Sequence, residues 1–254
     1  MKILVTGSNG FIGKNLIAAL RIDKELQILE YNRETDQSLL EKYCREADMV
    51  YHLAGCNRPK EEEEYEQVNV GFTRKILELL KKEGNFCPIV YTSSIQALLN
   101  NPYGRSKKAG EELFFKYARE TGAKVYLYRL PNVFGKGCRP NYNSVIATLC
   151  YNTINNLPTR IDDSKHLMRL VYIDDLVNDM TGFIHRNDRD NGFCEVSQIY
   201  HATLGRIVEL IYDFKQESVK TIDLSDEFTS KLYNTYLSYL PEQRDNFTGE
   251  GEGM

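Results

Sequence analysis

The chain has 254 residues, the length of one large domain or two small ones, and it can bury a core without disulfides. Its 32 basic and 36 acidic residues give a net charge of −4, so it lacks the basic excess of a general nucleic-acid binder. No apolar run approaches the roughly 20 residues of a membrane-spanning helix, and the first residues do not follow the pattern of a secretory signal. Six scattered cysteines and four scattered histidines predict reduced thiols in a cytoplasmic protein that binds no metal.

Short apolar runs alternate with amphipathic stretches through the first half of the chain. Strands are predicted at residues 2–6, 26–31, 48–53, 88–93 and 124–129, and helices at 11–21, 37–46, 65–82 and 105–120. Such alternation, with strands this apolar, indicates parallel strands covered by helices on both faces. The predicted fold class is therefore α/β, with a Rossmann-type doubly wound parallel sheet.

After residue 129 the regular alternation of predicted strands and helices ends. A loop rich in glycine and proline occupies residues 135–140, and helical patterns follow at 143–157, 174–185 and 203–215. We expect a dinucleotide-binding core over residues 1–135, with return segments near 170–186. A small, mostly helical substrate lobe is expected over 136–245, and residues 246–254 are expected to form a disordered tail.

Three glycines follow the first strand, in the sequence TGSNGFIG at residues 6–13. Gly7 permits a tight turn, Gly10 lets a pyrophosphate approach the backbone, and Gly13 lets the helix pack closely on the strand. The N–H groups at the start of the helix then face the phosphates. The residues expected to hold a dinucleotide here are Gly7, Asn9, Gly10, Phe11, Ile12 and Gly13.

The second strand ends without the acidic residue that an NAD-binding protein usually places there. It runs instead into Asn32 and Arg33. The planar guanidinium of Arg33 matches the oxygens of a 2′-phosphate, whereas Glu30 comes too early in the strand. We therefore expect Asn32 and Arg33 to contact the cofactor, and the cofactor to be NADP(H).

Tyr103 and Lys107 lie four residues apart, on one face of a helix. An ammonium group there can lower the pKa of a tyrosine toward neutral pH, so that the tyrosine exchanges a proton with a ketone oxygen. Ser94, at the end of the fourth strand, is the candidate to hydrogen-bond and polarise the same carbonyl, with Ser93 as the second choice. Ser94, Tyr103 and Lys107 are the predicted catalytic residues.

Five motifs occur in the expected order: TGSNGFIG, HLAG at 52–55, TSS at 92–94, YGRSK at 103–107 and RLPNVFGKG at 129–137. Together they resemble the extended short-chain dehydrogenases/reductases of the NAD-dependent epimerase/dehydratase family. The resemblance implies that Leu53, Ala54, Gly55 and Asn69 contact the cofactor, as do Tyr103 and Lys107. It also implies that Asn132 contacts a nucleotide-sugar substrate.

Residues 131–151 and 235–241 are similar to a narrower group, the bifunctional UDP-sugar 3-epimerase/4-reductases of capsular polysaccharide synthesis. Their reductase domain implies NADPH-dependent reduction of a UDP-linked 4-keto-6-deoxy amino sugar, in a homodimer formed through helices 65–82 and 105–120. A cupin domain epimerises C3 in that group. We expect it to be a separate protein here, or a C-terminal domain outside this sequence.

The sequence leaves alternative interpretations for several residues and for the function. The residues Arg139, Asn141, Asn143 and Arg169 are diphosphate or uracil contacts, or alternatively plain surface residues or helix caps. Only 16 residues separate Tyr31 from Asp48, which leaves room for one helix and no further strand beside the adenine pocket. The alternatives to a reductase are an NAD-dependent nucleotide-sugar 4-epimerase and a redox-sensing protein without turnover. His52 is expected to serve in packing rather than in catalysis.

Overall fold

The computed structural model describes residues 1–184, 191–216 and 223–241. By its internal contacts the chain divides into two compact units, which are described one at a time. The first unit contains Met1–Pro131 and Leu176–Ser197, and the second contains Asn132–Asp175 and the described chain from Gln198 onward. The expected tail at 246–254 lies outside the described residues.

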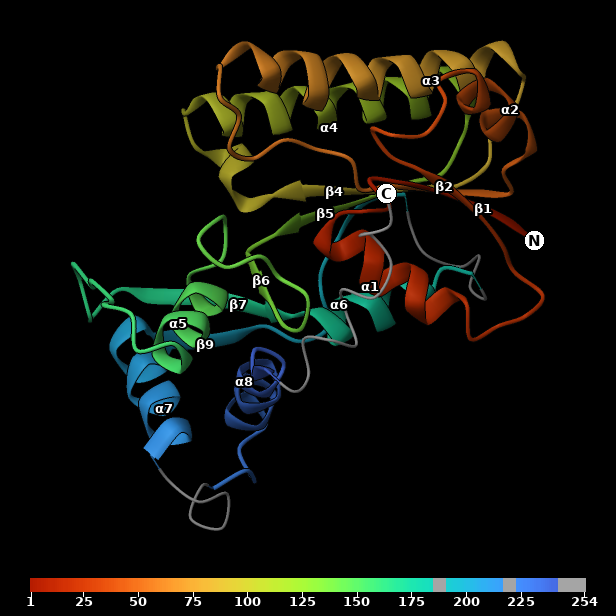
Figure 1. Ribbon diagram of the computed structural model, residues 1–254. Coiled ribbons are helices and arrows are strands. Elements are labelled where there is room, and N and C mark those ends of the chain that lie inside the picture. Colours follow the sequence, from red (N-terminus) through yellow and green to blue (C-terminus); the bar gives the residue numbers. More distant parts are fainter. Residues whose placement is uncertain (185–190, 217–222, 242–254) are drawn as a thin grey trace, which may run out of the picture. The chain divides into compact units, whose positions relative to one another are not determined.

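The first unit is built on a six-stranded, fully parallel sheet (Figure 1). The strands, in spatial order, are β2 (Gln27–Tyr31), β1 (Lys2–Thr6), β3 (Met49–His52), β4 (Ile89–Ser94), β5 (Val125–Leu130) and β8 (Gly192–Cys194). The order reverses beside β1, because β2 lies on one side of it and β3 on the other. Ligands of open α/β sheets bind at the carboxyl ends of the strands at such a reversal.

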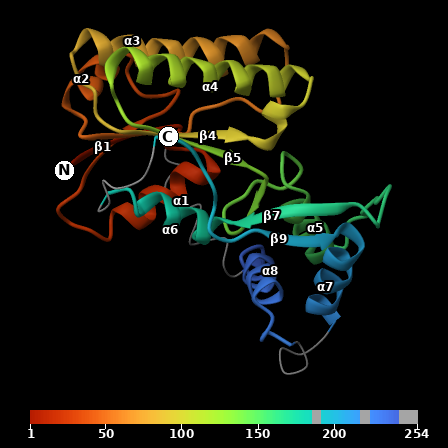
Figure 2. The same ribbon diagram turned by 180° about the vertical axis from the view of Figure 1, so that it is seen from behind.

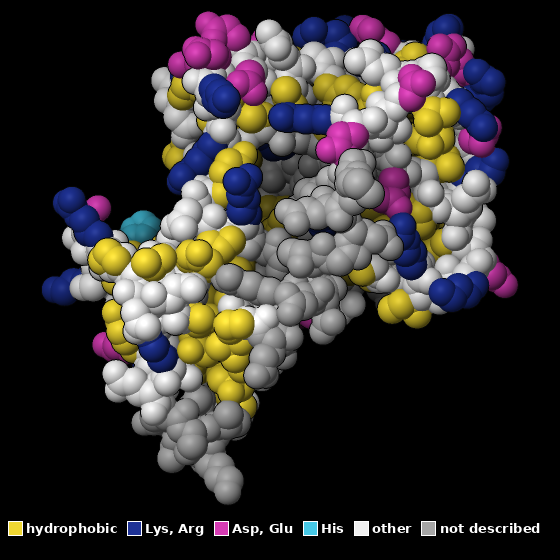
Figure 3. All heavy atoms as spheres, in the orientation of Figure 1, with side chains coloured by type: hydrophobic (Ala, Val, Ile, Leu, Met, Phe, Trp, Pro, Cys, Tyr) yellow, Lys and Arg dark blue, Asp and Glu magenta, His cyan; other side chains and the backbone are white. Residues whose placement is uncertain are grey.

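Helices cover both faces of this sheet. Figures 1 and 2 show α2 (Ser38–Glu46), α3 (Phe72–Lys82) and α4 (Pro102–Thr121) on one face, and α1 (Phe11–Leu20) and α6 (Ile173–Thr181) on the other. The inner sides of α2, α3 and α4 pack against the sheet through buried residues such as Leu40, Ile76 and Phe114. The outer sides are charged, with acidic and basic side chains interspersed over α3 and α4 (Figure 3). The α/β, doubly wound fold predicted from the sequence is confirmed.

Two helices differ from their predicted form. The expected helix 65–82 begins as a π-helical segment, η1 (Tyr65–Gly71), and becomes α-helical only at Phe72. The expected helix 105–120 begins three residues earlier, at Pro102, because the Asn101 side chain accepts a 2.7 Å hydrogen bond from the Gly104 N–H and caps the helix. Tyr103 therefore lies in the first turn of α4.

The second unit contains a three-stranded sheet that the sequence analysis did not predict. The strands, in order, are β6 (Asn132–Phe134), β7 (Leu167–Tyr172) and β9 (Tyr200–Thr203), with β7 and β9 antiparallel. Its helices are α5 (Val145–Ile154), α7 (Leu204–Gln216) and α8 (Glu227–Leu237), of which α8 was also missed. None of the described helices in the chain combines the length and the apolar character needed to cross a membrane.

Candidate functional site

The loop between β1 and α1 is shaped by its glycines. Gly7 has a φ of +71°, and a Cβ built on it lies 2.7 Å from the backbone nitrogen of Ala54. A Cβ on Gly13 lies 2.3 Å from the carbonyl oxygen of Gly7, so the first turn of α1 touches the loop directly. Gly10 is the N-cap of α1 and donates its own N–H to the carbonyl oxygen of Gly7, and no side chain caps the N–H groups of the first turn of the helix. The loop therefore offers free N–H donors at a helix N-terminus, an arrangement that fits a pyrophosphate.

The end of β2 lies beside this loop. Asn32 Nδ2 donates a 3.2 Å hydrogen bond to Ser8 Oγ, which ties the two segments together. Arg33 is exposed, and its charge lies near enough to Cys56, in the segment that follows β3, to act on the pKa of that thiol in the lowering direction. Glu30 is held by Arg21 at 2.6 Å. The group that β2 presents at its end is therefore a cation, which fits a 2′-phosphate better than a free ribose.

The segment after β3 is fixed by Asn69, which η1 buries to 1% exposure. Its Oδ1 accepts a hydrogen bond from Cys56 N at 2.7 Å, and its Nδ2 donates to Cys56 O and to Ser106 Oγ, both at 2.9 Å. Both amide hydrogens are thus used within the protein. Asn69 thus holds the backbone at Cys56, directly after the Leu53–Gly55 segment.

Ser94 and Tyr103 are brought together. Ser94 ends β4 and Tyr103 lies in the first turn of α4, and the Ser94 hydroxyl is near enough to act on the pKa of Tyr103 as a hydrogen-bonding group. Burial raises the pKa of Tyr103 to about 12, although the Ser94 hydroxyl acts in the lowering direction. Tyr103 is therefore protonated at neutral pH and has a proton to donate.

Lys107 lies one turn further along α4 and is 5% exposed. Its Nζ donates a 2.7 Å hydrogen bond to the carbonyl oxygen of Thr92 and lies 4.5 Å from the centre of the Tyr91 ring. Burial lowers the pKa of Lys107 to about 7. The sequence argument assigned the lowering of the Tyr103 pKa to Lys107, whereas in the structure the group that lowers it is Ser94.

Other residues beside Tyr103 and Lys107 were missed by the sequence analysis. The ring of Tyr65 lies 5.8 Å from that of Tyr103, and its hydroxyl donates to Asn57 O at 2.9 Å. Glu111, one turn after Lys107, is also buried. The regular spacing of Tyr103, Lys107 and Glu111 along one helix face was the signal that could have found it.

His52 is held in the packing, as the sequence analysis expected. Its Nδ1 is 2.8 Å from Thr6 Oγ1 and its Nε2 is 2.9 Å from Thr73 Oγ1, with no exposed surface. Burial lowers its pKa to about 3, so the ring stays neutral at physiological pH.

Of the predicted substrate contacts, Ser94 belongs to the first unit, and Asn132, Arg139, Asn141 and Asn143 belong to the second. Asn132 is exposed on β6, and Arg139 lies over the ring of Tyr142 at 5.5 Å. Asn141 adopts a left-handed backbone with φ of 55°, and its N–H donates to Thr148 Oγ1. Asn143 Oδ1 is buried and accepts no hydrogen bond from the described residues, so it is suited to receive a donor from a ligand.

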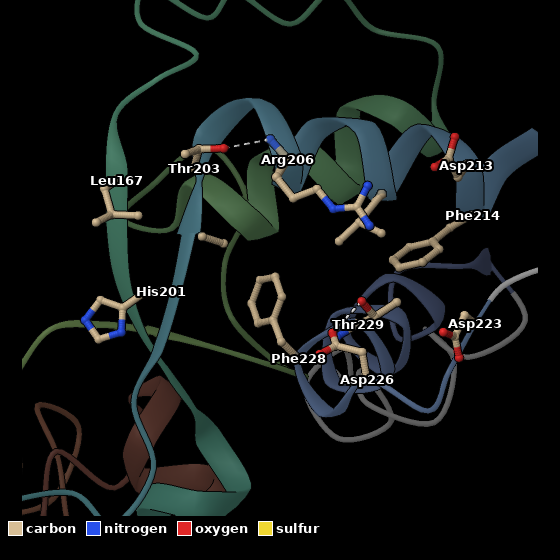
Figure 4. Close-up of a pocket in the computed structure, with 12 residues that line it drawn as sticks. Leu167, His201, Thr203, Arg206, Asp213, Phe214, Asp223, Asp226, Phe228 and Thr229 are labelled. Atoms are coloured by element: carbon tan, nitrogen blue, oxygen red, sulfur yellow. Dashed lines mark hydrogen bonds between the residues drawn. The ribbon is translucent and has the colours of Figure 1, made fainter.

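A cavity of about 760 Å³ also lies in the second unit, between β9, α7 and α8 (Figure 4). The guanidinium of Arg206 and the rings of Phe214 and Phe228 gather around it. Three carboxylates line it, from Asp213, Asp223 and Asp226. This acidic lining does not suit a diphosphate, and none of the four predicted substrate residues of the second unit contributes to it.

The six cysteines are free thiols, and the described residues contain no group of three or more His, Cys, Asp or Glu side chains that could hold a metal ion. The chemistry available in the first unit is therefore that of Ser94, Tyr103 and Lys107, beside a loop that fits a dinucleotide. When bound there, a nicotinamide cofactor would supply hydride chemistry.

Comparison with known proteins agrees with this geometry. The chain is 40% identical over 250 residues to a UDP-2-acetamido-2,6-beta-L-arabino-hexul-4-ose reductase of Pseudomonas aeruginosa, covering 98% of this chain and 67% of the relative. Among solved structures it resembles the capsular polysaccharide assembling protein CapF of Staphylococcus aureus, with 41% identity and a TM-score of 0.85 over 95% of this chain and 66% of that one. The chain thus spans about two thirds of the length of these relatives.

A more distant structure shares the fold. It is the UDP-glucuronic acid 4-epimerase of Bacillus cereus in complex with NAD, which is 20% identical with a TM-score of 0.80 and is covered over 94% of this chain and all of that one. The family model described as the NAD dependent epimerase/dehydratase family matches residues 3–193. With a family match over most of its length and a relative at 40% identity, the chain belongs to the NAD dependent epimerase/dehydratase family.

Proposed function

We propose that this chain reduces the 4-keto group of a UDP-linked 2-acetamido-2,6-dideoxyhexos-4-ulose with NADPH, in the synthesis of capsular or O-antigen polysaccharide precursors. The observation that carries the proposal is the pairing of Ser94 with a protonated Tyr103 beside the buried Lys107. The name of the reductase at 40% identity supports the substrate class.

The protonated state of Tyr103 suits the reduction of a ketone. A ketone that receives hydride needs a proton at its oxygen, and a tyrosine whose pKa is about 12 holds that proton at neutral pH. A 4-epimerase must first remove a proton from a hydroxyl group, which requires the tyrosinate. A 4-epimerase passes through the same reduction after its oxidation step, so net consumption of the cofactor, rather than the protonation of Tyr103, separates the two functions.

Each residue has a distinct part in the proposed step. Ser94 hydrogen-bonds the carbonyl oxygen and orients it, and Tyr103 donates its proton to that oxygen. Lys107 holds the nicotinamide ribose and then supports the tyrosinate left behind. NADPH, when bound, supplies the hydride. The substrate's nucleotide is assigned to Asn132, Arg139, Asn141 and Asn143.

NADPH is preferred in the proposal because Arg33 follows β2 where an acid would favour NAD. The exposed guanidinium beside Cys56 supports this choice. In this proposal the preference for NADPH thus depends on Arg33, a residue that lies outside the five family motifs.

The decisive experiment incubates the full chain with the UDP-linked 4-keto sugar and either NADPH or NADH, and follows the absorbance of the reduced cofactor. We expect NADPH to be consumed in proportion to a 4-hydroxy product, and Tyr103→Phe to abolish most of this turnover. Interconversion of UDP-hexose epimers without net cofactor consumption would instead identify a 4-epimerase. Binding of cofactor without turnover of any 4-keto sugar would identify a sensor.

The proposal includes a cytoplasmic homodimer packed through α3 and α4. Leu77, Leu113 and Tyr117 line a groove between these helices, with charged side chains along its rim. Leu77 and Tyr117 are already buried within the unit, so the half-buried Leu113 is the apolar side chain of this groove that a second copy would cover. Sedimentation equilibrium of the unmodified chain should give the dimer mass, and Leu113→Arg should give the monomer mass.

A further inference from the structure

Glu111 forms a buried cluster with residues of three strands. Its side chain is 3% exposed. Its Oε1 accepts hydrogen bonds from Ser93 Oγ at 2.5 Å and from Arg129 Nε at 2.9 Å, and its Oε2 accepts from Arg129 Nη2 at 2.6 Å. The guanidinium of Arg129 lies 4.1 Å from the centre of the Phe193 ring. The Glu111 carboxylate thus connects α4 directly with β4 and β5. It is connected with β8 indirectly, because Arg129 packs on Phe193.

This cluster holds the segment of β4 that carries the reactive groups. Ser93 is bonded to Glu111, and its two neighbours are both used in the site. The preceding residue, Thr92, offers its carbonyl oxygen to Lys107, and the following residue, Ser94, acts on the pKa of Tyr103 as a hydrogen-bonding group. A carboxylate anchored on Ser93 therefore controls where both neighbours lie.

The same carboxylate provides negative charge for Lys107. The titratable groups that face Lys107 are His52 from β3, Tyr91 from β4, and Tyr103 and Glu111 from α4. His52 is neutral, because its pKa is lowered to about 3, and burial raises the pKa of both tyrosines. Among these groups Glu111 is the anion, and its effect is to raise the pKa of Lys107 against burial.

We propose that Glu111 is a positioning residue of the site: through Ser93 it aligns the end of β4, and through its charge it keeps Lys107 as an ammonium near neutral pH. Arg129 holds the carboxylate in place with two hydrogen bonds and limits the negative charge that reaches Lys107. The catalytic consequence rests on the reductase function proposed above, whereas the effect on Lys107 does not.

The first test titrates Lys107 in the cofactor-free full chain. The ¹³Cε signal of Lys107 is followed by NMR against pH in protein with labelled lysine, and is assigned by its disappearance in Lys107→Arg. In Glu111→Gln the midpoint should fall by about one pH unit or more, the usual effect of removing a neighbouring opposite charge. Glu112→Gln is the matched control, because Glu112 is the exposed neighbour on the same helix and should leave the midpoint unchanged.

Arg129→Gln tests the effect of the Glu111 charge on Lys107 by a change in the opposite direction. This variant keeps the carboxylate and removes the positive partner, so the midpoint of Lys107 should rise. A cluster that only cross-links the sheet would move the midpoint in neither variant, and that result overturns the proposal. Each variant that folds, as judged by its circular dichroism spectrum, is decisive by itself.

The second test measures turnover. Under the proposal, the loss of activity at high pH begins at lower pH in Glu111→Gln than in the unmodified protein, in step with the midpoint from NMR. Ser93→Ala keeps both charges and removes one hydrogen bond, so it should lower kcat while leaving the Lys107 midpoint unchanged. A Ser93→Ala variant with unchanged kcat contradicts the alignment role. An unmodified chain that shows no reductase turnover contradicts the proposed function, and the Lys107 titration still decides the role of Glu111.

Discussion

Lys107 reaches from α4 to the backbone of β4, where its Nζ donates a 2.7 Å hydrogen bond to the carbonyl oxygen of Thr92. The ammonium is buried, and this burial lowers its pKa from 10.5 to about 7. A lysine that binds protons less well in the folded than in the unfolded state destabilises the fold, most strongly at pH values below about 7. This cost fades as the pH rises from 7 toward 10.5.

We therefore expect Lys107→Met to stabilise the protein. Removing the buried ammonium should raise the free energy of unfolding by about 4–5 kcal/mol at pH 7. Loss of the hydrogen bond to Thr92 O should lower it by about 1–3 kcal/mol. The free energy of unfolding should rise by roughly 2 kcal/mol while turnover is lost, as measured by urea unfolding and the NADPH assay. The exposed neighbour provides the control, since Lys108→Met should change neither quantity appreciably.

Tyr103→Phe removes the proposed proton donor and keeps the ring. Turnover should fall by about 10²–10⁴, the usual contribution of one acid–base group, while the Kd for NADPH stays nearly unchanged. Tyr212→Phe is the control, because Tyr212 is an exposed tyrosine of α7, in the second unit, and losing its hydroxyl should leave turnover unchanged. Full activity in Tyr103→Phe would rule out the mechanism.

Arg33→Ala tests the choice between NADPH and NADH. A charge-assisted contact with the 2′-phosphate contributes roughly 1.5–3 kcal/mol, so this variant should lose most of the preference for NADPH in fluorescence titrations. Affinity for NADH should change little. Arg21→Ala removes a nearby surface arginine that pairs with Glu30 and should preserve the preference. Equal affinities for the two cofactors in the unmodified chain would contradict the assignment.

His52 should make the fold sensitive to acid. Its pKa is about 3 in the folded protein and about 6.5 when unfolded, so the unfolded chain binds more protons between these values. Stability should then fall by up to about 1.4 kcal/mol for each pH unit below 6.5. In His52→Gln, the free energy of unfolding measured with urea should lose this part of its dependence on pH between pH 6.5 and 4.5. His201 is exposed, and His201→Gln should keep the full slope.

The residues of the cofactor loop could be predicted from the sequence because their signals are local. A turn with φ of +71° at Gly7 and the close packing of Gly13 on Gly7 O both require glycine, and both stand within eight residues of chain. The spacing of Tyr103 and Lys107 likewise follows from one helix. The absence of a strand between β2 and β3 follows from length alone, because 16 residues accommodate only α2.

The sheet of the second unit could not be predicted in the same way. β6 has three residues and β9 has four, too few for a period to appear, and their shared partner β7 begins 33 residues after the end of β6 and ends 28 residues before the start of β9. Pairing at such separations depends on loop closure and on burial in the finished fold. The π-helical start of the helix after residue 65 is also a tertiary effect, since Asn69 there is buried against Cys56 and Ser106.

The sequence by itself determined which residues are proposed to carry the chemistry: the glycine loop, Arg33, Ser94, Tyr103 and Lys107. Only the tertiary structure decided their state. Burial leaves Tyr103 protonated and brings the pKa of Lys107 to about 7, and the fold brings Glu111 to Ser93 and Arg129 from three separate elements. The physical reason is that spacing along one helix or turn is encoded locally, whereas desolvation and ion pairing depend on groups that meet only when the whole sheet has assembled.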